Sequence, residues 1–127
     1  MKDNHAGIPE DMYREHILEL YKSPRNIGLI KNPTHEHTEH NSICGDEIKI
    51  QLLIKEGKIQ DAKFSGSGCV ISIVASSMLT DKLKGLNVEK AKGFTPENLM
   101  ELLKIKITPA RIKCALLPLE AVKKALK

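Results

Sequence analysis

The sequence is poor in aromatic residues and has no long apolar run. It contains no Trp, two Phe and two Tyr, which leaves few rings for stacking on bases, and its lysines are scattered rather than clustered. No segment approaches the roughly 18 apolar residues of a membrane-spanning helix, and the N-terminus MKDNHAGIPEDMY lacks the apolar region of a secretory signal. These absences predict a cytoplasmic protein that binds neither nucleic acid nor membranes.

Cysteine is scarce as well. Three cysteines cannot all pair within one chain, and thiols stay reduced in the cytoplasm. A chain of 127 residues is long enough to form one hydrophobic core without disulfides or a metal. The thiols are therefore available for metal binding or catalysis, or they are buried as small apolar side chains.

Acidic residues are few in the last third of the chain. Residues 1–81 hold 9 Lys plus Arg against 12 Asp plus Glu, whereas residues 82–127 hold 11 against 4. We expect the basic C-terminal part to dock on an acidic surface of a partner protein.

Periodicity predicts one α+β domain over residues 11–127, preceded by a flexible leader at residues 1–10. Apolar residues recur at helical spacing in residues 11–22. Alternation from Ile48 to Ile54, the turn KEGK and the segment IQDAKFS predict a β-hairpin. Since a lone hairpin is marginal, the segment NIGLI at residues 26–30 is predicted to complete a small three-stranded antiparallel sheet.

Several helices are predicted after the hairpin. The pattern changes from strand to helix at Cys69 and ends at Gly85. Two further helices are predicted to start with Thr-Pro pairs, at Thr95 and at Thr108. Pro118 is expected to split the last segment into a short turn and a terminal helix.

Each cysteine lies at a junction of predicted elements. Cys44 precedes a strand, Cys69 begins a helix, and Cys114 lies in the second turn of the last helix. The N–H groups at a helix start favour an anion such as a thiolate at Cys69. Asp46, two residues after Cys44, is poor core material but a suitable oxygen ligand. Three sulfurs and one carboxylate make a four-ligand set, with burial of the thiols in the core as the alternative.

Four motifs in order resemble the iron–sulfur cluster assembly scaffolds of the IscU, SufU and NifU N-terminal-domain family. They are YKSPRNIG (residues 21–28), CGDEIKIQL (44–52), FSGSGCVISIVASS (64–77) and RIKCALL (111–117). The resemblance covers about residues 12–126 and implies the fold of that family. It also implies a scaffold that is not itself an enzyme.

The resemblance implies that Cys44, Cys69 and Cys114 hold a [2Fe–2S] cluster or its precursor iron, with Asp46 beside them. A carboxylate in place of a fourth thiolate would keep the cluster labile and ready for transfer. Implied partners are a cysteine desulfurase, an iron donor and apo iron–sulfur acceptor proteins, and a homodimer sharing a cluster is possible. Cys114 is the candidate persulfide acceptor.

One departure from the IscU-type pattern keeps a second function open. Lys113 stands where IscU-type members have a histidine, as in SufU-type members, which favours a zinc-dependent sulfurtransferase with Zn²⁺ on the same residues. Cys114 follows Cys69 by only 45 positions, which is the compact IscU-like spacing and argues against this alternative. A purely structural zinc domain ranks below both, because such sites are normally closed by Cys and His.

Other polar residues are interpreted more simply. His35, His37 and His40 alternate with glutamates and are expected on a solvated loop or strand edge rather than on the metal. His16 is expected on the surface of the first helix. Ser72, Ser76 and Ser77 lack a predicted base nearby, so they are interpreted as small packing residues.

Overall fold

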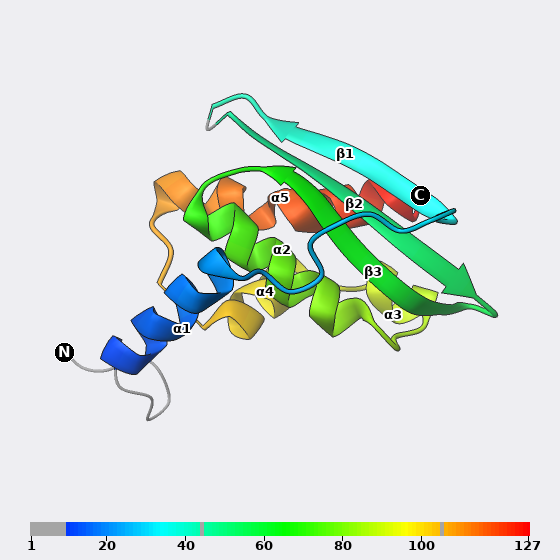
Figure 1. The fold of residues 1–127 in the computed structure, drawn as a ribbon, viewed down its shortest axis with the longest axis horizontal. Coiled ribbons are helices and arrows are strands. Elements are labelled where there is room, and N and C mark those ends of the chain that lie inside the picture. Colours follow the sequence, from blue (N-terminus) through cyan, green and yellow to red (C-terminus); the bar gives the residue numbers. More distant parts are fainter. Residues whose placement is uncertain (1–9, 44, 105) are drawn as a thin grey trace.

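The computed structural model describes residues 10–43, 45–104 and 106–127, with side chains described from Glu15 onward (Figure 1). The predicted leader lies outside the described residues except for Glu10, where the first helix begins. In chain order the elements are α1 (Glu10–Lys22), β1 (His35–Asn41), β2 (Asp46–Lys55), β3 (Lys58–Ser67), α2 (Val70–Leu83), α3 (Val88–Lys92), α4 (Pro96–Leu103) and α5 (Pro109–Ala125).

The predicted fold class is confirmed, because a three-stranded antiparallel sheet in the order β1-β2-β3 is packed by helices. The predicted hairpin is β2 and β3, with a two-residue turn at Glu56 and Gly57. Both turn residues have positive φ, 52° and 76°, which is the conformation that matches the twist of the flanking strands.

The third strand is not where the sequence pattern predicted it. Residues 35–41 form β1, whereas the segment 26–30 makes only a single parallel bridge, between Ile27 and Phe64. Positive φ values at Asn26 (65°) and Gly28 (136°) prevent a regular strand there. The sequence HEHTEHN has no alternating apolar face, so its strand character could not be read from hydrophobic periodicity.

The core lies between the sheet and the layer formed by α2 and α5, which pack on the same face of the sheet (Figure 1). On β2, Ile48, Ile50 and Leu52 are fully buried, and Phe64 of β3 lies opposite Ile50. α1 and α4 pack against α2 on its other sides. Alternation along β2 therefore directs the apolar side chains into one core.

Helix starts agree with the predictions. α4 begins after a capping box formed by Thr95 and Asn98, with Pro96 in its first turn, and α5 begins after Thr108 with Pro109.

The expected break at Pro118 is wrong, because α5 continues through it to Ala125. Burial of Pro118 and of neighbouring side chains holds the helix together, although Pro118 has no N–H to donate to the carbonyl four residues earlier. The short helix α3 was not predicted.

The outer edge of β3 is covered by two segments. Phe64 donates its N–H to the Asn26 carbonyl at 2.9 Å and accepts from the Gly28 N–H at 2.9 Å. Further along, Ile59 exchanges backbone hydrogen bonds of 2.8 Å with Gly85 and Leu86. β3 is thus an edge strand whose backbone groups are largely satisfied.

Within the part of the chain that the structure describes, no helix is both long enough and apolar enough to cross a membrane.

Candidate metal centre

Asp46 is the first residue of β2 and is held at the connection from β1. Asn41 at the end of β1 accepts hydrogen bonds from the Gly45 N–H, through its carbonyl at 2.8 Å, and from the Ile43 N–H, through its side chain at 3.1 Å. Gly45 has a φ of 74°, a conformation that glycine adopts without strain. This turn brings Asp46 back into register opposite Asn41.

The Asp46 carboxylate is almost completely buried, with 5% of the residue exposed. Its Oδ1 accepts a hydrogen bond from the Cys69 N–H at 3.2 Å. Its Oδ2 is the one buried side-chain oxygen or nitrogen among the described residues that has no hydrogen-bond partner. Leaving a buried acceptor unpaired costs about 1–3 kcal/mol unless a bound group satisfies it. This oxygen is therefore available to accept a bond from a bound group.

Cys69 is the N-cap residue of α2, as the sequence predicted. Its side chain makes no capping hydrogen bond, and the first turn of α2 contains no acidic residue. The Cys69 carbonyl accepts from the Ile73 N–H and from the Ser72 hydroxyl, both at 3.1 Å. The cap therefore leaves the sulfur available to a metal at the N-terminal end of the helix.

Two glycines allow the close approach of the strand end to Asp46. A Cβ on Gly68 would collide with the Ser72 hydroxyl and lie 3.3 Å from the Asp46 carboxyl carbon. A Cβ on Gly66, whose φ is 123°, would collide with the Glu47 carbonyl. Gly66 has both a positive φ and a backbone neighbour in the place of a Cβ, so only glycine fits there, whereas a Cβ at Gly68 would require the Ser72 side chain to move.

Cys114 lies in the second turn of α5 and is completely buried. One carboxylate oxygen of Asp46 and the sulfurs of Cys69 and Cys114 all lie within 4.8 Å of one another. Ligand atoms around a tetrahedral zinc or iron with bonds of about 2.3 Å are roughly 3.8 Å apart, so a small adjustment would place all three on one ion. Among the described residues this is the one cluster of its kind.

The structure brings together three of the four predicted ligands. Cys44, the fourth, lies outside the described residues, between Ile43 and Gly45 in the chain. Two thiols and a carboxylate form a donor set suited to zinc or iron, since thiolate-rich tetrahedral sites accept both metals. Lys113 and Arg111, which flank Cys114 in sequence, are exposed.

The three clustered histidines are on β1, an edge strand, as expected. His37 Nε2 is 2.9 Å from Glu39 Oε1, and His40 Nδ1 is 3.2 Å from Glu47 Oε1. No histidine joins the group of Asp46, Cys69 and Cys114 among the residues described. His37 and His40 therefore pair with carboxylates of the sheet, whereas His35 Nδ1 lies 3.0 Å from Thr34 Oγ1.

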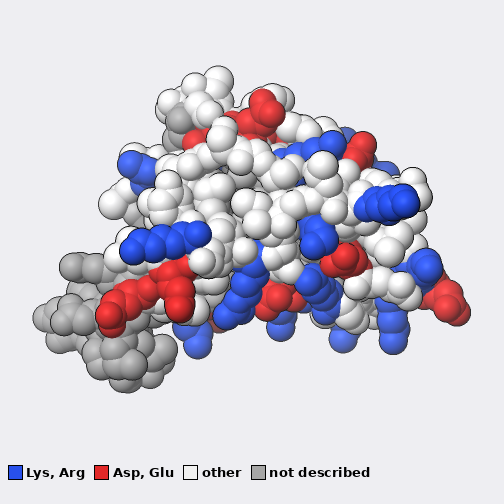
Figure 2. Space-filling model, viewed as in Figure 1, with Lys and Arg blue, Asp and Glu red and all other residues white. Residues whose placement is uncertain are grey.

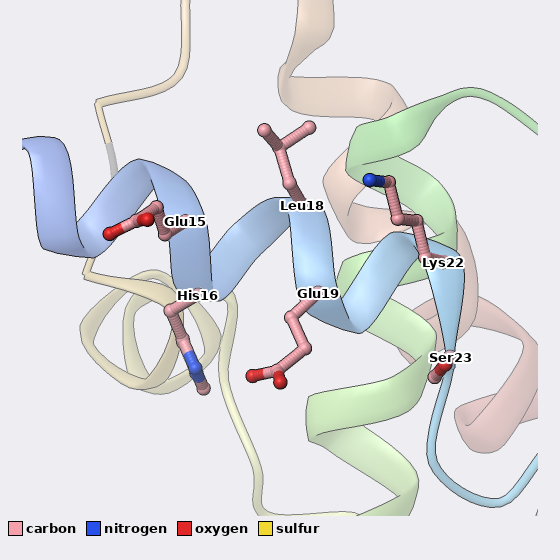
Figure 3. Close-up of a pocket in the computed structure, with 6 residues that line it drawn as sticks. All are labelled: Glu15, His16, Leu18, Glu19, Lys22 and Ser23. Atoms are coloured by element: carbon pink, nitrogen blue, oxygen red, sulfur yellow. The ribbon is translucent and has the colours of Figure 1, made fainter.

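His16 lies on the surface, as expected. It lines a shallow hollow on α1 together with Glu19 and Ser23, and Figure 3 shows the His16 and Glu19 side chains pointing to the same side, away from Leu18. None of the described residues that line this hollow is a cysteine or Asp46.

The serines of α2 are packing residues, which confirms their interpretation. Ser72, Ser76 and Ser77 are fully buried. Ser76 donates to the Ser72 carbonyl at 2.7 Å, and the Ser77 hydroxyl accepts from the Arg25 N–H at 2.7 Å. Ser77 thereby attaches the segment after α1 to α2.

Among the described residues, the resolved pKa shifts lie on β1 and at the end of α5. Burial opposes ionisation of Glu39, but hydrogen bonds from Lys124 and His37 outweigh it and lower the Glu39 pKa below 4.5. The same hydrogen bond raises the pKa of Lys124 above 10.5. A hydrogen bond from Gln51 and the charge of Lys49 lower the pKa of Glu36.

Basic side chains are distributed rather than gathered on the face shown in Figure 2. Lys and Arg lie along the margin formed by the helices and alternate with Asp and Glu. The exposed lysines at the end of α2 and on or near α3 are Lys82, Lys84, Lys90 and Lys92.

Comparison with known proteins gives consistent matches over nearly the whole chain. The family model for NifU-like N-terminal domains matches residues 12–127. The zinc-dependent sulfurtransferase SufU of Bacillus subtilis is 33% identical, over 92% of this chain and 90% of that protein. The iron–sulfur cluster assembly scaffold protein IscU of Thermotoga maritima is 33% identical, over 91% of this chain and 93% of that protein.

A solved structure shares the architecture. The crystal structure of an iron–sulfur cluster assembly scaffold protein for the SUF system, from Fervidobacterium islandicum, superposes with a TM-score of 0.79 at 27% identity, covering 94% of this chain and 100% of that chain.

Proposed function

The chain belongs to the family of NifU-like N-terminal domains, and on that premise we propose that it is an iron–sulfur cluster assembly scaffold. It accepts sulfur from a cysteine desulfurase and iron from a donor, assembles a labile [2Fe–2S] cluster as cargo, and transfers the cluster to apo-proteins. Cys44, Cys69, Cys114 and Asp46 are the proposed ligands.

The observation that carries this proposal is the buried carboxylate of Asp46, which has one unpartnered oxygen and lies beside two cysteine sulfurs. A site that held a cluster permanently would be expected to close with a fourth thiolate. A carboxylate is a harder and weaker partner for iron than a thiolate, so the incoming thiol of an acceptor displaces it more readily. The donor set therefore suits a protein that releases its cargo.

Sulfur delivery is proposed to use Cys114. Its thiolate attacks the outer sulfur of the desulfurase persulfide, a new S–S bond forms on Cys114, and the desulfurase cysteine leaves as a thiolate. Conversion of that sulfur to sulfide takes two electrons from an external reductant. Because Cys114 is fully buried, the first turns of α5 must open for this attack, whereas Cys69 is already partly exposed.

Pro118 makes such an opening easier. It follows Cys114 by four positions and cannot donate the backbone hydrogen bond that would tie the Cys114 carbonyl to the next turn. The turns before Pro118 are therefore less firmly connected to the rest of α5 than a continuous hydrogen-bond ladder would make them.

A second candidate function is a zinc-dependent sulfurtransferase. It is favoured by Lys113, which takes the position where a histidine would supply a further ligand, and by the similarity to the Bacillus subtilis protein. In this case Zn²⁺ on the same residues would order the site, and one cysteine would leave the metal to carry sulfur.

Anaerobic reconstitution with iron, cysteine and a cysteine desulfurase separates the two functions. Growth of visible iron–sulfur absorbance, followed by its transfer to an apo-ferredoxin, is the result expected for the scaffold. Tightly bound zinc, no cluster, and faster turnover of the desulfurase on addition of this protein would favour the sulfurtransferase instead. The Cys69→Ser and Cys114→Ser variants, examined by mass spectrometry after sulfur loading, identify the persulfide-bearing residue.

A further inference from the structure

The two edges of the sheet differ in how they are covered. The edge of β3 is bonded by residues 26–28 and 85–87. On the opposite edge, β1 has β2 on one side, and no strand pairs with its other side among the described residues (Figure 1). Alternate backbone N–H and C=O groups along seven residues of β1 therefore point outward from the sheet.

β1 carries charged glutamates but lacks other features that prevent edge strands from pairing. It contains no proline and no lysine, and its register with β2 is continuous over all seven residues, without a bulge. Protected edges carry such features, because an exposed, regular strand is a template for another strand. What β1 carries instead is an ordered series of imidazoles and carboxylates.

That series is self-complementary. If two copies of HEHTEHN pair antiparallel with Thr38 opposite Thr38, every glutamate of one strand lies opposite a histidine of the other. The cross-strand pairs are Thr38 with Thr38, His37 with Glu39, Glu36 with His40, and His35 with Asn41. We propose that the protein forms a homodimer in which two β1 strands pair antiparallel around Thr38, joining the two sheets into one of six strands.

Imidazole–carboxylate pairs already form on this strand within one chain. His37 pairs with Glu39 at 2.9 Å and His40 pairs with Glu47 at 3.2 Å. His40 uses Nδ1 for Glu47, so its other ring nitrogen, Nε2, is the one to meet Glu36 of the second copy. Glu36 and His40 are well exposed, with side-chain exposures of 49% and 64%, so both are accessible to a second strand.

This dimer leaves both metal centres accessible. The strands run in opposite directions, so Asn41, next to the metal centre, lies at opposite ends of the paired strands in the two copies. Three residues on each side of the symmetry axis, at about 3.3 Å per residue, separate the two Asn41 positions by roughly 20 Å. Each copy therefore holds its own cargo, and no cluster is shared across this interface.

A matched pair of variants tests the proposal by sedimentation velocity over a concentration series. In the His40→Glu variant, a carboxylate lies opposite Glu36 of the other copy at two places in each dimer. Two attractive pairs are thereby replaced by two repulsive pairs, and the dissociation constant of the dimer should rise by about ten-fold or more. His35→Glu makes the same change of side chain opposite the neutral Asn41, and its dimer should persist.

The swap Glu36→His with His40→Glu restores the complementarity. In the double variant, as in the single His40→Glu variant, a glutamate at position 40 lies beside Glu47 of the same chain. If the dimer recovers, the restored pairing between positions 36 and 40 of the two copies must be the cause. Circular dichroism establishes that each variant is folded. The wild-type dimer should survive EDTA, since the proposed pairing uses no metal.

Covalent trapping gives an independent result. Thr38→Cys places two thiols opposite each other across the axis, at a Cα separation of about 4.5–5.5 Å that suits a disulfide. Oxidation should give a dimer whose disulfide maps by mass spectrometry to the two substituted positions. Lys49→Cys, on the neighbouring strand, should give none. A monomeric wild-type protein at all concentrations, a dimer that EDTA dissolves, or equal effects of His35→Glu and His40→Glu would overturn the proposal.

Discussion

Two carboxylates, the buried Asp46 and the half-buried Glu39, have opposite surroundings. Glu39 on β1 accepts hydrogen bonds from Lys124 at 2.9 Å and from His37 at 2.9 Å, which stabilise its charged form. Asp46 on the adjacent strand has one hydrogen bond, from the Cys69 N–H, and its second oxygen has no partner among the described residues. Both oxygens of Glu39 therefore have partners within the chain, whereas Asp46 has one oxygen without a partner among the described residues.

The difference shows how a functional carboxylate is distinguished from a structural one. Burial alone does not separate them. The separation comes from what faces each carboxylate: Lys124 and His37 of the same chain around Glu39, and two cysteine sulfurs around Asp46. α5 contributes to both regions, because Cys114 lies near its start, Lys124 lies near its end, and Pro118 lies between them.

The largest effect is expected from removing a sulfur of the metal centre. Cys69→Ser should abolish cluster retention, because a hydroxyl is a far poorer ligand for iron than a thiolate. Visible absorbance after anaerobic reconstitution and desalting measures this. The free energy of unfolding of the metal-free variant should stay close to that of the wild type. Normal cluster retention by this variant would show that the ligand set is wrongly assigned.

The next effect is expected at Asp46. Asp46→Ala should make the bound cluster several-fold longer-lived and slower to transfer, because the labile oxygen ligand is lost and a thiol from solution can complete a four-sulfur set. Asp46→Asn is the matched variant, because the side-chain oxygen of asparagine can still accept the hydrogen bond from the Cys69 N–H. Transfer to an apo-ferredoxin is followed by circular dichroism. Faster loss of the cluster in both variants would contradict this account of the carboxylate.

Pro118→Ala should join the first turns of α5 more firmly to the rest of the helix. The new N–H can donate to the Cys114 carbonyl, so the first turns of the helix become harder to open and sulfur loading of Cys114 should slow several-fold. Mass-spectrometric timing of persulfide formation measures the rate. Loading at the wild-type rate, in a variant whose amide exchange around Cys114 is slower, would argue against an opening of α5.

The smallest effect is expected at Glu39. Its pKa in the folded protein lies below 4.5, so it stabilises the fold above about pH 4.5, and this stabilisation is lost as the pH falls through the lowered pKa. Glu39→Gln should lower the free energy of unfolding by about 1 kcal/mol at neutral pH and flatten its decrease in acid. Denaturant titrations from pH 7 to pH 3 measure both, with Glu97→Gln on the exposed surface of α4 as the control.

The sequence predicted those features that depend on local signals. Alternation located β2 and β3, Thr-Pro pairs located the starts of α4 and α5, and the change of period located Cys69 at the start of α2. The sequence also predicted that Asp46, Cys69 and Cys114 converge, because each lies near a junction of predicted elements and because the four motifs resemble a known family.

Features set by tertiary contacts could not be predicted in the same way. β1 has polar residues on both faces and is held by its register with β2 and by the Glu39–Lys124 ion pair, 85 positions apart in sequence. α5 continues through Pro118 because the surrounding side chains bury it. The unpartnered oxygen of Asp46 is likewise a property of the folded chain.

The central claim is that Asp46 and the cysteines hold iron–sulfur cargo together, and X-ray absorption at the iron edge of the reconstituted protein tests it most directly. We predict an oxygen ligand beside the sulfur ligands, which disappears in Asp46→Asn and persists in Glu39→Gln. Iron ligated by sulfur alone in the wild type, or an oxygen ligand that remains in Asp46→Asn, would contradict the account.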